Sequence, residues 1–186
     1  MTASPHPDQL ADQLADQYPI GPIPTLPGHD RATLEAVAAR MLGAAQAWRT
    51  LLSGLTEADL GQRYRPGSWT VHQLAHHAAD AHLHGLVRLS YGLAEQPYTI
   101  QPMNEQAWLA LPTTAAPVQD ALTLLDGLNL RWTALLLGTD PGALDVQIIH
   151  PQEGQQTLWR LIAKHDWHLR HHLAHAQLAL GLEVAR

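Results

Sequence analysis

Apolar residues recur three and four positions apart in four long segments of the chain, which is the spacing of an amphipathic helix. Asp30 precedes the first segment as an N-cap residue, and Thr70 with Gln73 forms the pattern of a capping box at the start of the second. Gly181 follows the last segment, where glycine commonly closes a helix. The pattern therefore predicts helices at about residues 31–53, 71–94, 118–137 and 157–180.

The connections between these segments differ in character. Residues 95–117 form a long crossover, and residues 146–157 surround a Gln-Glu-Gly turn, which predicts a short hairpin. Residues 1–30 are rich in proline and predict an extended arm rather than a helix. The pattern as a whole favours an all-α fold, with one four-helix-bundle domain at residues 31–186 behind an N-terminal arm at residues 1–30.

Composition narrows the class of protein. The 186 residues are 46% hydrophobic and 15% charged, which is typical of one globular domain. The net charge is −6 and the 11 basic residues are scattered, so nucleic-acid binding is not expected. The sequence has no apolar run of membrane-spanning length, and its N-terminus lacks the features of a signal peptide. We therefore expect a cytoplasmic protein with no membrane partner.

Histidine is the compositional outlier, with 13 residues in a chain that has no cysteine. Five of them fall in the stretch HDWHLRHHLAHAQ, residues 165–177. His168 and His172 are four positions apart, so both imidazoles project from one face of the fourth helix and can reach the same ion. The second helix offers further donors, and spacing alone leaves five candidates open: His72, His76, His77, Asp80 and His82.

Solvated surface, a pH switch and a metal site are the competing explanations for so many imidazoles. A single histidine is usually solvated or is a satisfied polar group in the core. Imidazoles packed together in a core cost desolvation free energy, which a bound cation offsets. Two histidine-rich helices in one chain therefore favour a metal site, whereas the solvated or core-polar interpretation is preferred for His6, His29, His82, His84 and His150.

The available donors restrict the metal and its chemistry. The two histidine-rich helices carry too few carboxylates for a di-iron bundle, and the HExxH motif of zinc proteases is absent. Three neutral imidazoles suit Zn²⁺, Ni²⁺, Cu²⁺ or Fe²⁺ and leave a coordination position for water or substrate. An ion held in this way activates either a hydroxide or a thiolate for attack.

Several blocks of the sequence resemble the DinB/YfiT-like superfamily, and its YfiT-type branch in particular. The likeness covers most of the chain, and its histidine-rich blocks are YRPGSWTVHQLAHHAADAH (64–82) and WHLRHHLAH (167–175). Four shorter blocks are YPIG (18–21), NEQAW (104–108), RWTALL (131–136) and HPQEG (150–154). The crossover departs from the family pattern, because Asn104 precedes Glu105 where the family has Asp before Glu, a change that bears on the substrate pocket.

The resemblance implies a four-helix bundle with up-up-down-down connectivity and a homodimer. It also implies that His77, His168 and His172 hold one divalent metal ion per chain, which we expect to be Zn²⁺ or Ni²⁺. Members of the family are described as metal-dependent hydrolases and as bacillithiol S-transferases. We therefore expect a metal-dependent enzyme that transfers a small-molecule thiol to an electrophilic substrate. Hydrolysis by metal-bound hydroxide is the first alternative, and a non-catalytic, metal-binding stress-response bundle is the second.

Five further residues are candidates for the surroundings of the ion. Tyr64, Arg65, Trp69 and Arg88 are expected at the mouth of the site, where they would bind an anionic group of the substrate. Asp80 is expected to accept the free ring N–H of a metal-binding histidine. No residue is assigned as the catalytic acid or base.

Overall fold

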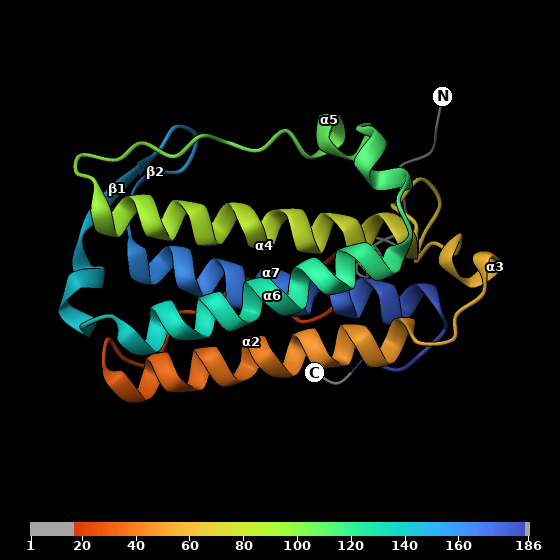
Figure 1. Cartoon of the computed structure of the whole chain (residues 1–186), viewed down its shortest axis with the longest axis horizontal. Helices are drawn as coiled ribbons and strands as arrows, with labels where there is room; N and C mark the ends of the chain where they lie inside the picture. Colours follow the sequence, from red (N-terminus) through yellow and green to blue (C-terminus); the bar gives the residue numbers. More distant parts are fainter. Residues whose placement is uncertain (1–16, 185–186) are drawn as a thin grey trace, which may run out of the picture.

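Four long helices lie side by side in the computed structural model, which describes residues 17–184 (Figure 1). They are α2 (Arg31–Leu52), α4 (Val71–Ala94), α6 (Val118–Gly138) and α7 (Leu158–Ala179). A two-stranded antiparallel sheet, β1 (Gln147–His150) and β2 (Gly154–Thr157), leads into α7. The all-α four-helix bundle, the long crossover and the hairpin before the last helix are thus confirmed.

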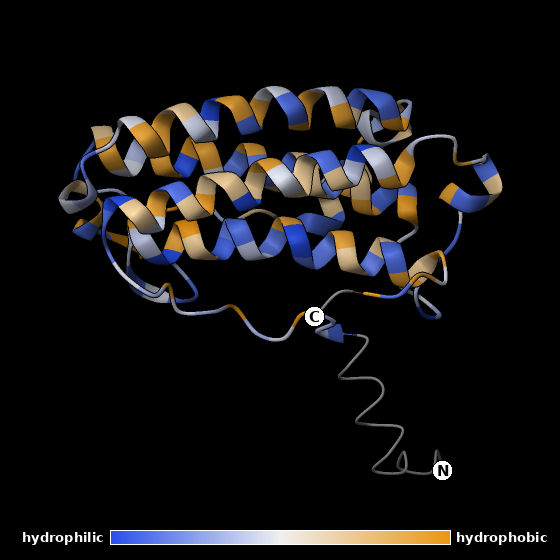
Figure 2. Ribbon diagram, turned by 90° about the horizontal axis from the view of Figure 1, so that it is seen from below, coloured by the Kyte–Doolittle hydropathy of each residue, from blue (hydrophilic) through white to orange (hydrophobic). Residues whose placement is uncertain are grey.

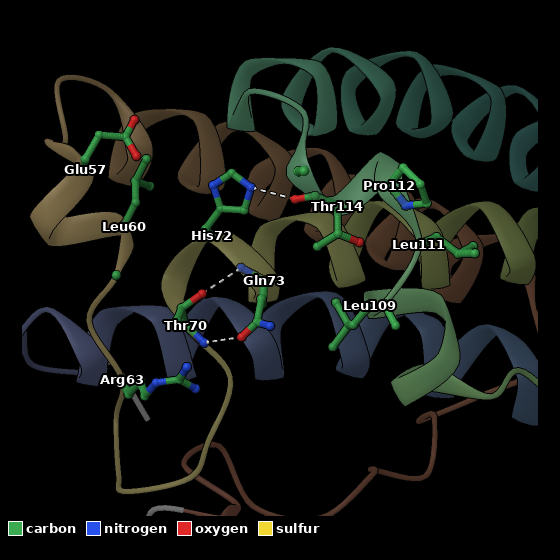
Figure 3. A pocket seen from close by; sticks show the side chains of 13 residues that line it. Glu57, Leu60, Arg63, Thr70, His72, Gln73, Leu109, Leu111, Pro112 and Thr114 are labelled. Carbon is green, nitrogen blue, oxygen red and sulfur yellow. Dashed lines mark hydrogen bonds between the residues drawn. The ribbon is translucent and has the colours of Figure 1, made fainter.

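Side-chain caps explain why the helices begin where the sequence predicts. The Asp30 carboxylate accepts a hydrogen bond from the backbone of the first turn of α2. Thr70 and Gln73 bond to each other's backbone N–H groups in a complete capping box at the start of α4 (Figure 3). Thr157 caps α7 with its hydroxyl oxygen alone, which accepts a hydrogen bond from Arg160 N. Each cap satisfies N–H groups that a helix end otherwise leaves unpaired.

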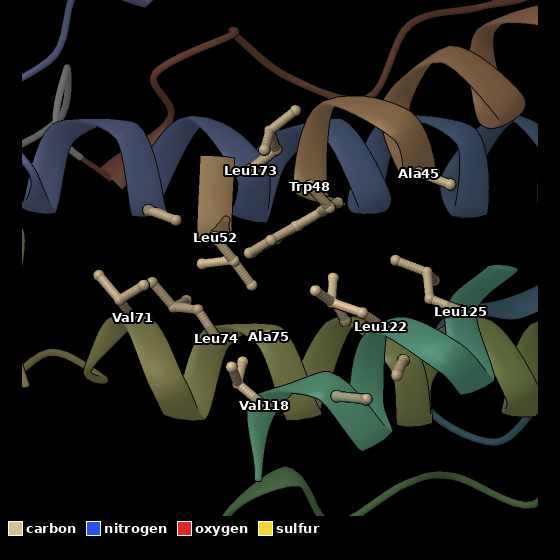
Figure 4. Close-up of a cluster of buried hydrophobic side chains, with 14 of the residues drawn as sticks. Ala45, Trp48, Leu52, Val71, Leu74, Ala75, Val118, Leu122, Leu125 and Leu173 are labelled. Atoms are coloured by element: carbon tan, nitrogen blue, oxygen red, sulfur yellow. The ribbon is translucent and has the colours of Figure 1, made fainter. Parts of the chain in front are cut away.

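Two hydrophobic clusters, one toward each end of the bundle, show the direction of every helix. One cluster joins the end of α2 and the end of α7 to the start of α4 and the start of α6 (Figure 4). The other joins the opposite ends of the same four helices. The first cluster includes Trp48, Leu52, Val71, Leu74, Val118, Leu122 and Leu173. The α2 and α7 helices therefore run one way, and α4 and α6 run the other.

This arrangement is up-down-down-up, so the expected up-up-down-down order of the helices was wrong. An up-up-down-down bundle needs two connections that travel its full length. This chain has one, residues 95–117, which returns from the end of α4 to the start of α6 (Figure 1). The other two connections join helix ends that lie at the same end of the bundle.

Short elements that the sequence pattern did not predict lie in the connections. They are α3 (Glu57–Leu60), α5 (Glu105–Leu109), and two 3-10 turns at Pro112–Ala115 and Pro141–Asp145. The crossover is tied to the hairpin, because Ile100 N donates to Ile149 O at 2.8 Å and Ile149 N donates to Tyr98 O at 3.0 Å. These bonds hold the crossover across α4 and α7 next to the site described below.

The described part of the N-terminal segment, residues 17–30, has little regular structure and follows the bundle. Trp167 Nε1 donates a hydrogen bond to Gly21 O at 2.9 Å, which attaches this segment to α7. Residues 1–16 of the expected arm lie outside the described residues.

Hydrophobic and hydrophilic positions alternate along each long helix, as amphipathic packing requires (Figure 2). Within residues 17–184, no helix has the length and hydropathy needed to cross a membrane.

A buried carboxylate connects two helices of the bundle. Asp166 on α7 is 1% exposed, and it accepts hydrogen bonds from Arg40 Nε of α2 at 2.9 Å and from Arg170 Nε at 3.2 Å. Both arginines remain partly exposed to solvent. Two arginines compensate the buried negative charge of Asp166. If that charge is removed, both guanidinium groups lose their ion-pair partner and must be hydrated instead.

We expect Asp166→Asn to lower the free energy of unfolding by about 2–3 kcal/mol, because the arginines are partly hydrated and the full cost of a broken buried pair is not reached. Urea denaturation would measure the change. Asp126→Asn is the matched control, because Asp126 and Arg49 form an exposed pair between α6 and α2. That control should cost less than about 1 kcal/mol. Equal losses in the two variants would contradict a special role for the buried carboxylate.

Candidate metal centre

Three imidazoles from two helices meet in the interior of the bundle. His77 comes from α4, and His168 and His172 come from α7. The distance between His77 Nε2 and His168 Nε2 is 3.2 Å, and that between His172 Nε2 and His168 Nε2 is 3.1 Å. The structure thus brings together the pair expected from helical spacing and the partner implied by the family resemblance.

These distances fit coordination to one ion. Tetrahedral zinc with bonds of 2.0–2.1 Å holds its nitrogen ligands about 3.3 Å apart. Two neighbouring Nε2 atoms can form one hydrogen bond only if one of them donates and the other accepts. A cation instead binds the lone pairs of all three Nε2 atoms at once. The donor set is all nitrogen, which suits Zn²⁺, Ni²⁺, Cu²⁺ or Fe²⁺.

Burial prepares the three imidazoles for a metal by keeping them neutral. It lowers the pKa of His77 to about 4. Burial also holds the pKa values of His168 and His172 well below the ordinary range, and neighbouring imidazoles lower them further. A neutral imidazole offers its lone pair to a metal without first releasing a proton. The ring of Trp69 packs against His77 and His172, with centroid distances of 4.5 and 5.7 Å, and shields this side of the site.

The other candidates on α4 point elsewhere. Nε2 of His72 lies 2.8 Å from Thr114 O (Figure 3). Nε2 of His76 lies 3.1 Å from Ala116 O, so these two histidines bind the end of the crossover. His82 is 2% exposed and its ring lies against Trp132. Among the histidines of α4, His77 alone belongs to the cluster with His168 and His172 in the described part of the chain.

Asp80 is not brought to the metal centre. Burial raises the pKa of its carboxyl group, and within residues 17–184 it makes no hydrogen bond to any of the three histidines. It also lines neither of the cavities that open onto the site. Asp80 is four residues after His76, whose ring bonds Ala116 O at the end of the crossover, so it follows that side of α4 rather than the stripe of His77, Ala81 and His84 that lines the cavity.

His175, one turn further along α7, has the role that was expected for Asp80: it is the hydrogen-bond partner of a candidate metal ligand. Its Nδ1 lies 3.3 Å from Nδ1 of His172, and its ring stacks on Tyr64 at a centroid distance of 4.2 Å. When His172 offers Nε2 to a metal, its Nδ1 carries the proton and donates it in this hydrogen bond. His175 thereby fixes the tautomer and orientation of a ligand. The histidine-rich run contained this residue, but the spacing did not reveal its role.

We expect His175→Ala to weaken metal binding by about 10–100-fold, the usual effect of removing the hydrogen-bond partner of a metal-binding histidine. Competition with a chromophoric chelator would measure the dissociation constant. His175→Gln keeps a hydrogen-bond acceptor and should restore part of the affinity. Unchanged affinity in His175→Ala would show that the residue only packs against Tyr64.

Two cavities open onto the metal centre, and His168 lines both. The first, of about 430 Å³, also includes Tyr64, Arg65, Trp69 and His172. The second, of about 320 Å³, includes His77 and Arg88 and is bounded by α4, α7, the crossover and the hairpin turn. Four of the five residues expected around the ion therefore line these two cavities, and Asp80 is the exception.

A larger cavity, of about 560 Å³, lies at the other side of the α4 start, between α3 and the end of the crossover (Figure 3). Its lining mixes apolar residues with charged and polar ones, among them Glu57, Arg63 and His72, and it contains none of the three clustered histidines. Size therefore does not identify the site in this bundle, and the converging imidazoles do.

The profile of the DinB superfamily matches residues 40–176, which is most of the chain and includes all three clustered histidines. The chain belongs to the DinB superfamily. A relative from Bacillus pumilus, named "Putative metal-dependent hydrolase", is 34% identical over 160 residues, covering 86% of this chain and 91% of that protein. A relative from Bacillus mycoides with the same description is 37% identical over 124 residues, covering 67% of this chain and 72% of that protein.

A solved DinB-type structure extends the agreement to three dimensions. YfiT from Bacillus subtilis, described as "a probable metal-dependent hydrolase with an unusual four-helix bundle topology", superposes with a TM-score of 0.83 at 28% identity. The match covers 91% of this chain and 99% of that one. The shared bundle supports a metal-dependent function for the DinB site.

The DinB bundle of this chain contains a second group of donors beside the first. His171, His172 and His175 offer nitrogen atoms within 4.8 Å of one another. His171 stacks on Trp167 at a centroid distance of 4.1 Å, and burial lowers its pKa to about 3. His172 belongs to both groups, and one neutral imidazole has a single lone pair for a metal. Occupation of the first group therefore leaves the second without a complete ligand set.

Proposed function

We propose that this chain is a mononuclear metal-dependent enzyme that transfers a low-molecular-weight thiol to an electrophile. The observation that carries the proposal is the convergence of three neutral imidazoles, from His77, His168 and His172, at a place reached from two cavities. A divalent cation held there would lower the pKa of a coordinated thiol and so supply a nucleophile at neutral pH.

Two separate cavities favour a reaction with two substrates. One cavity lies on the Tyr64 side of His168 and the other on the Arg88 side, so a thiol and an electrophile can approach the same point from different directions. The chain has no cysteine, so the thiol must be a cosubstrate. The ring of Trp69 packs against His77 and His172 and gives this side of the site an apolar surface, against which an organic thiol could lie.

Hydrolysis is the second candidate, and the descriptions of the relatives favour it, because they name metal-dependent hydrolases. The same three histidines would hold the metal ion for hydrolysis, with water in place of the thiol.

A homodimer and a cytoplasmic location remain our expectations. Light scattering on the purified chain and fractionation of the source cells would test them.

One experiment separates these functions. The metal-loaded chain is incubated with an epoxide or a chlorinated electrophile, with and without bacillithiol or glutathione, and the products are identified by mass spectrometry. Thiol transfer predicts a product that carries the thiol and forms only when the thiol is present. Hydrolysis predicts a product that forms without the thiol. His172→Ala is the control for both reactions, and turnover that persists in this variant would contradict either assignment.

A further inference from the structure

The cavity on the Arg88 side of the metal centre contains an arginine without a counter-ion. Arg88 NH2 donates a hydrogen bond to Gln101 O at 2.8 Å, and Arg88 forms no ion pair with a carboxylate in residues 17–184. Its Nε is buried and has no hydrogen-bond partner among the described residues. A guanidinium in this position lacks both the negative charge and the paired acceptor oxygens that it binds best.

The Glu153 carboxylate attracts Arg88 through space, but no charge of this cavity forms an ion pair with Arg88 within residues 17–184. Glu153 is paired with Lys164 of α7, and His150 lies 3.6 Å from the same carboxylate. Glu105 lies at the rim, exposed in the first turn of α5. The Lys164 and Glu153 charges cancel each other, so Arg88 provides the positive charge that remains inside the cavity.

Arg88 shares a face of α4 with the metal ligand His77. The positions 77, 81, 84 and 88 all line the cavity, at the spacing of one helical stripe. Eleven residues of helix separate the Cα atoms of His77 and Arg88 by about 16 Å. Helical side chains lean toward the N-terminus, so the guanidinium lies closer to the metal centre than its own Cα does.

We propose that Arg88 binds the anionic group, a carboxylate or a phosphate, of the small molecule that reacts at the metal centre. The unpaired Nε–H and a neighbouring N–H of the guanidinium would donate hydrogen bonds to two oxygens of such a group, while its reactive end reaches toward His77 and His168. As a statement about the substrate, this inference rests on the proposed function. It names the substrate class as a small anionic molecule whose charge lies on the order of 10 Å from the reacting atom.

The test measures anion binding to the metal-free full-length chain, so that an anion cannot be held by the metal itself. Inorganic phosphate and acetate are titrated separately by calorimetry, and the tighter probe identifies the class of anion. We expect saturable binding of at least one of them. We expect Arg88→Gln to weaken it by about tenfold or more, as loss of a charge-assisted contact does.

Two further variants keep the result interpretable. Arg131→Gln removes an exposed arginine of α6 that lines a different cavity and should leave anion binding unchanged. Arg88→Lys keeps the charge without the planar fork and should bind with intermediate affinity, which also guards against a folding defect in Arg88→Gln. Equal binding by wild type and Arg88→Gln, or no saturation by either anion up to about 10 mM, would overturn the proposal. These anion titrations do not depend on the metal content of the chain. Metal content is measured separately, and it tests the proposed function.

Discussion

Replacement of His172 by alanine is expected to remove almost all of the metal that the wild-type chain binds, which should be about one ion per chain. His172 Nε2 lies 3.1 Å from His168 Nε2, so the variant leaves only two imidazoles for the ion. Zinc in four-ligand sites binds with about 10–16 kcal/mol, or roughly 3 kcal/mol per ligand. The loss of one ligand should therefore weaken binding by at least about 100-fold, and elemental analysis of the purified proteins would detect it.

Two other variants show which group of histidines holds the ion. His77→Ala should lose metal as His172→Ala does, because its imidazole completes the group from the other helix. His171→Ala removes a histidine of the second group and should retain about one ion per chain. Retention of metal by His77→Ala would show that α4 contributes no ligand, even if α7 does.

The metal-free protein is expected to lose stability steeply as the pH falls from 7 to about 5.5. Burial lowers the pKa of His77 and of His82 to about 4 and holds those of His165, His168 and His172 well below the ordinary value. In the unfolded chain these imidazoles regain a pKa of about 6.5 and take up protons that the folded chain excludes. Stability is therefore complete above the unfolded pKa and is lost below it.

Each of these five histidines should cost about 1 kcal/mol between pH 7 and pH 5.5. Together they would remove several kcal/mol, which is comparable with the whole stability of many domains. Thermal unfolding at a series of pH values would measure the effect. His82→Gln should make the dependence shallower by about one proton. A melting temperature that stays constant from pH 7 to 5.5 would contradict the neutral, buried state of the imidazoles.

Local signals in the sequence predicted the elements of the fold. Asp30, Thr70 with Gln73, and Thr157 cap the helices that they were expected to begin. The hairpin lies at the Gln-Glu-Gly turn, and Gly154 takes the positive φ of +80° that such a turn requires. The short α3 and α5 were not predicted, because helices of one turn depend on tertiary contacts rather than on periodicity.

The direction of the helices could not be read from the same signals. Periodicity identifies the face that each helix buries, but it does not say which helix covers that face. Trp48, for example, contributes to a cluster with residues from the ends of three other helices, and nothing in its own segment identifies them. The sequence does show that only one connection is long enough to travel the length of the bundle. An up-up-down-down bundle needs two such connections, so the loop lengths alone argue against it.

The candidate site was predictable where the donors lie on one helix. His168 and His172 share a face because they are four residues apart, and this holds in any α-helix. The partner on α4 depended on how two helices pack, so spacing left five candidates open. Asp80 was expected to accept the ring N–H of a metal-binding histidine, but it lies three residues after His77 and, among the described residues, bonds to none of the three. The Nδ1 of His172 is instead 3.3 Å from Nδ1 of His175, on its own helix.

The most direct test of the metal centre is a crystal structure of the metal-loaded chain, with anomalous diffraction measured above and below the absorption edge of the metal. One anomalous peak within bonding distance of Nε2 of His77, His168 and His172 is the result that we predict. A peak at His171 and His175 instead, or an ion that contacts α7 but not His77, would contradict a site shared between the two helices.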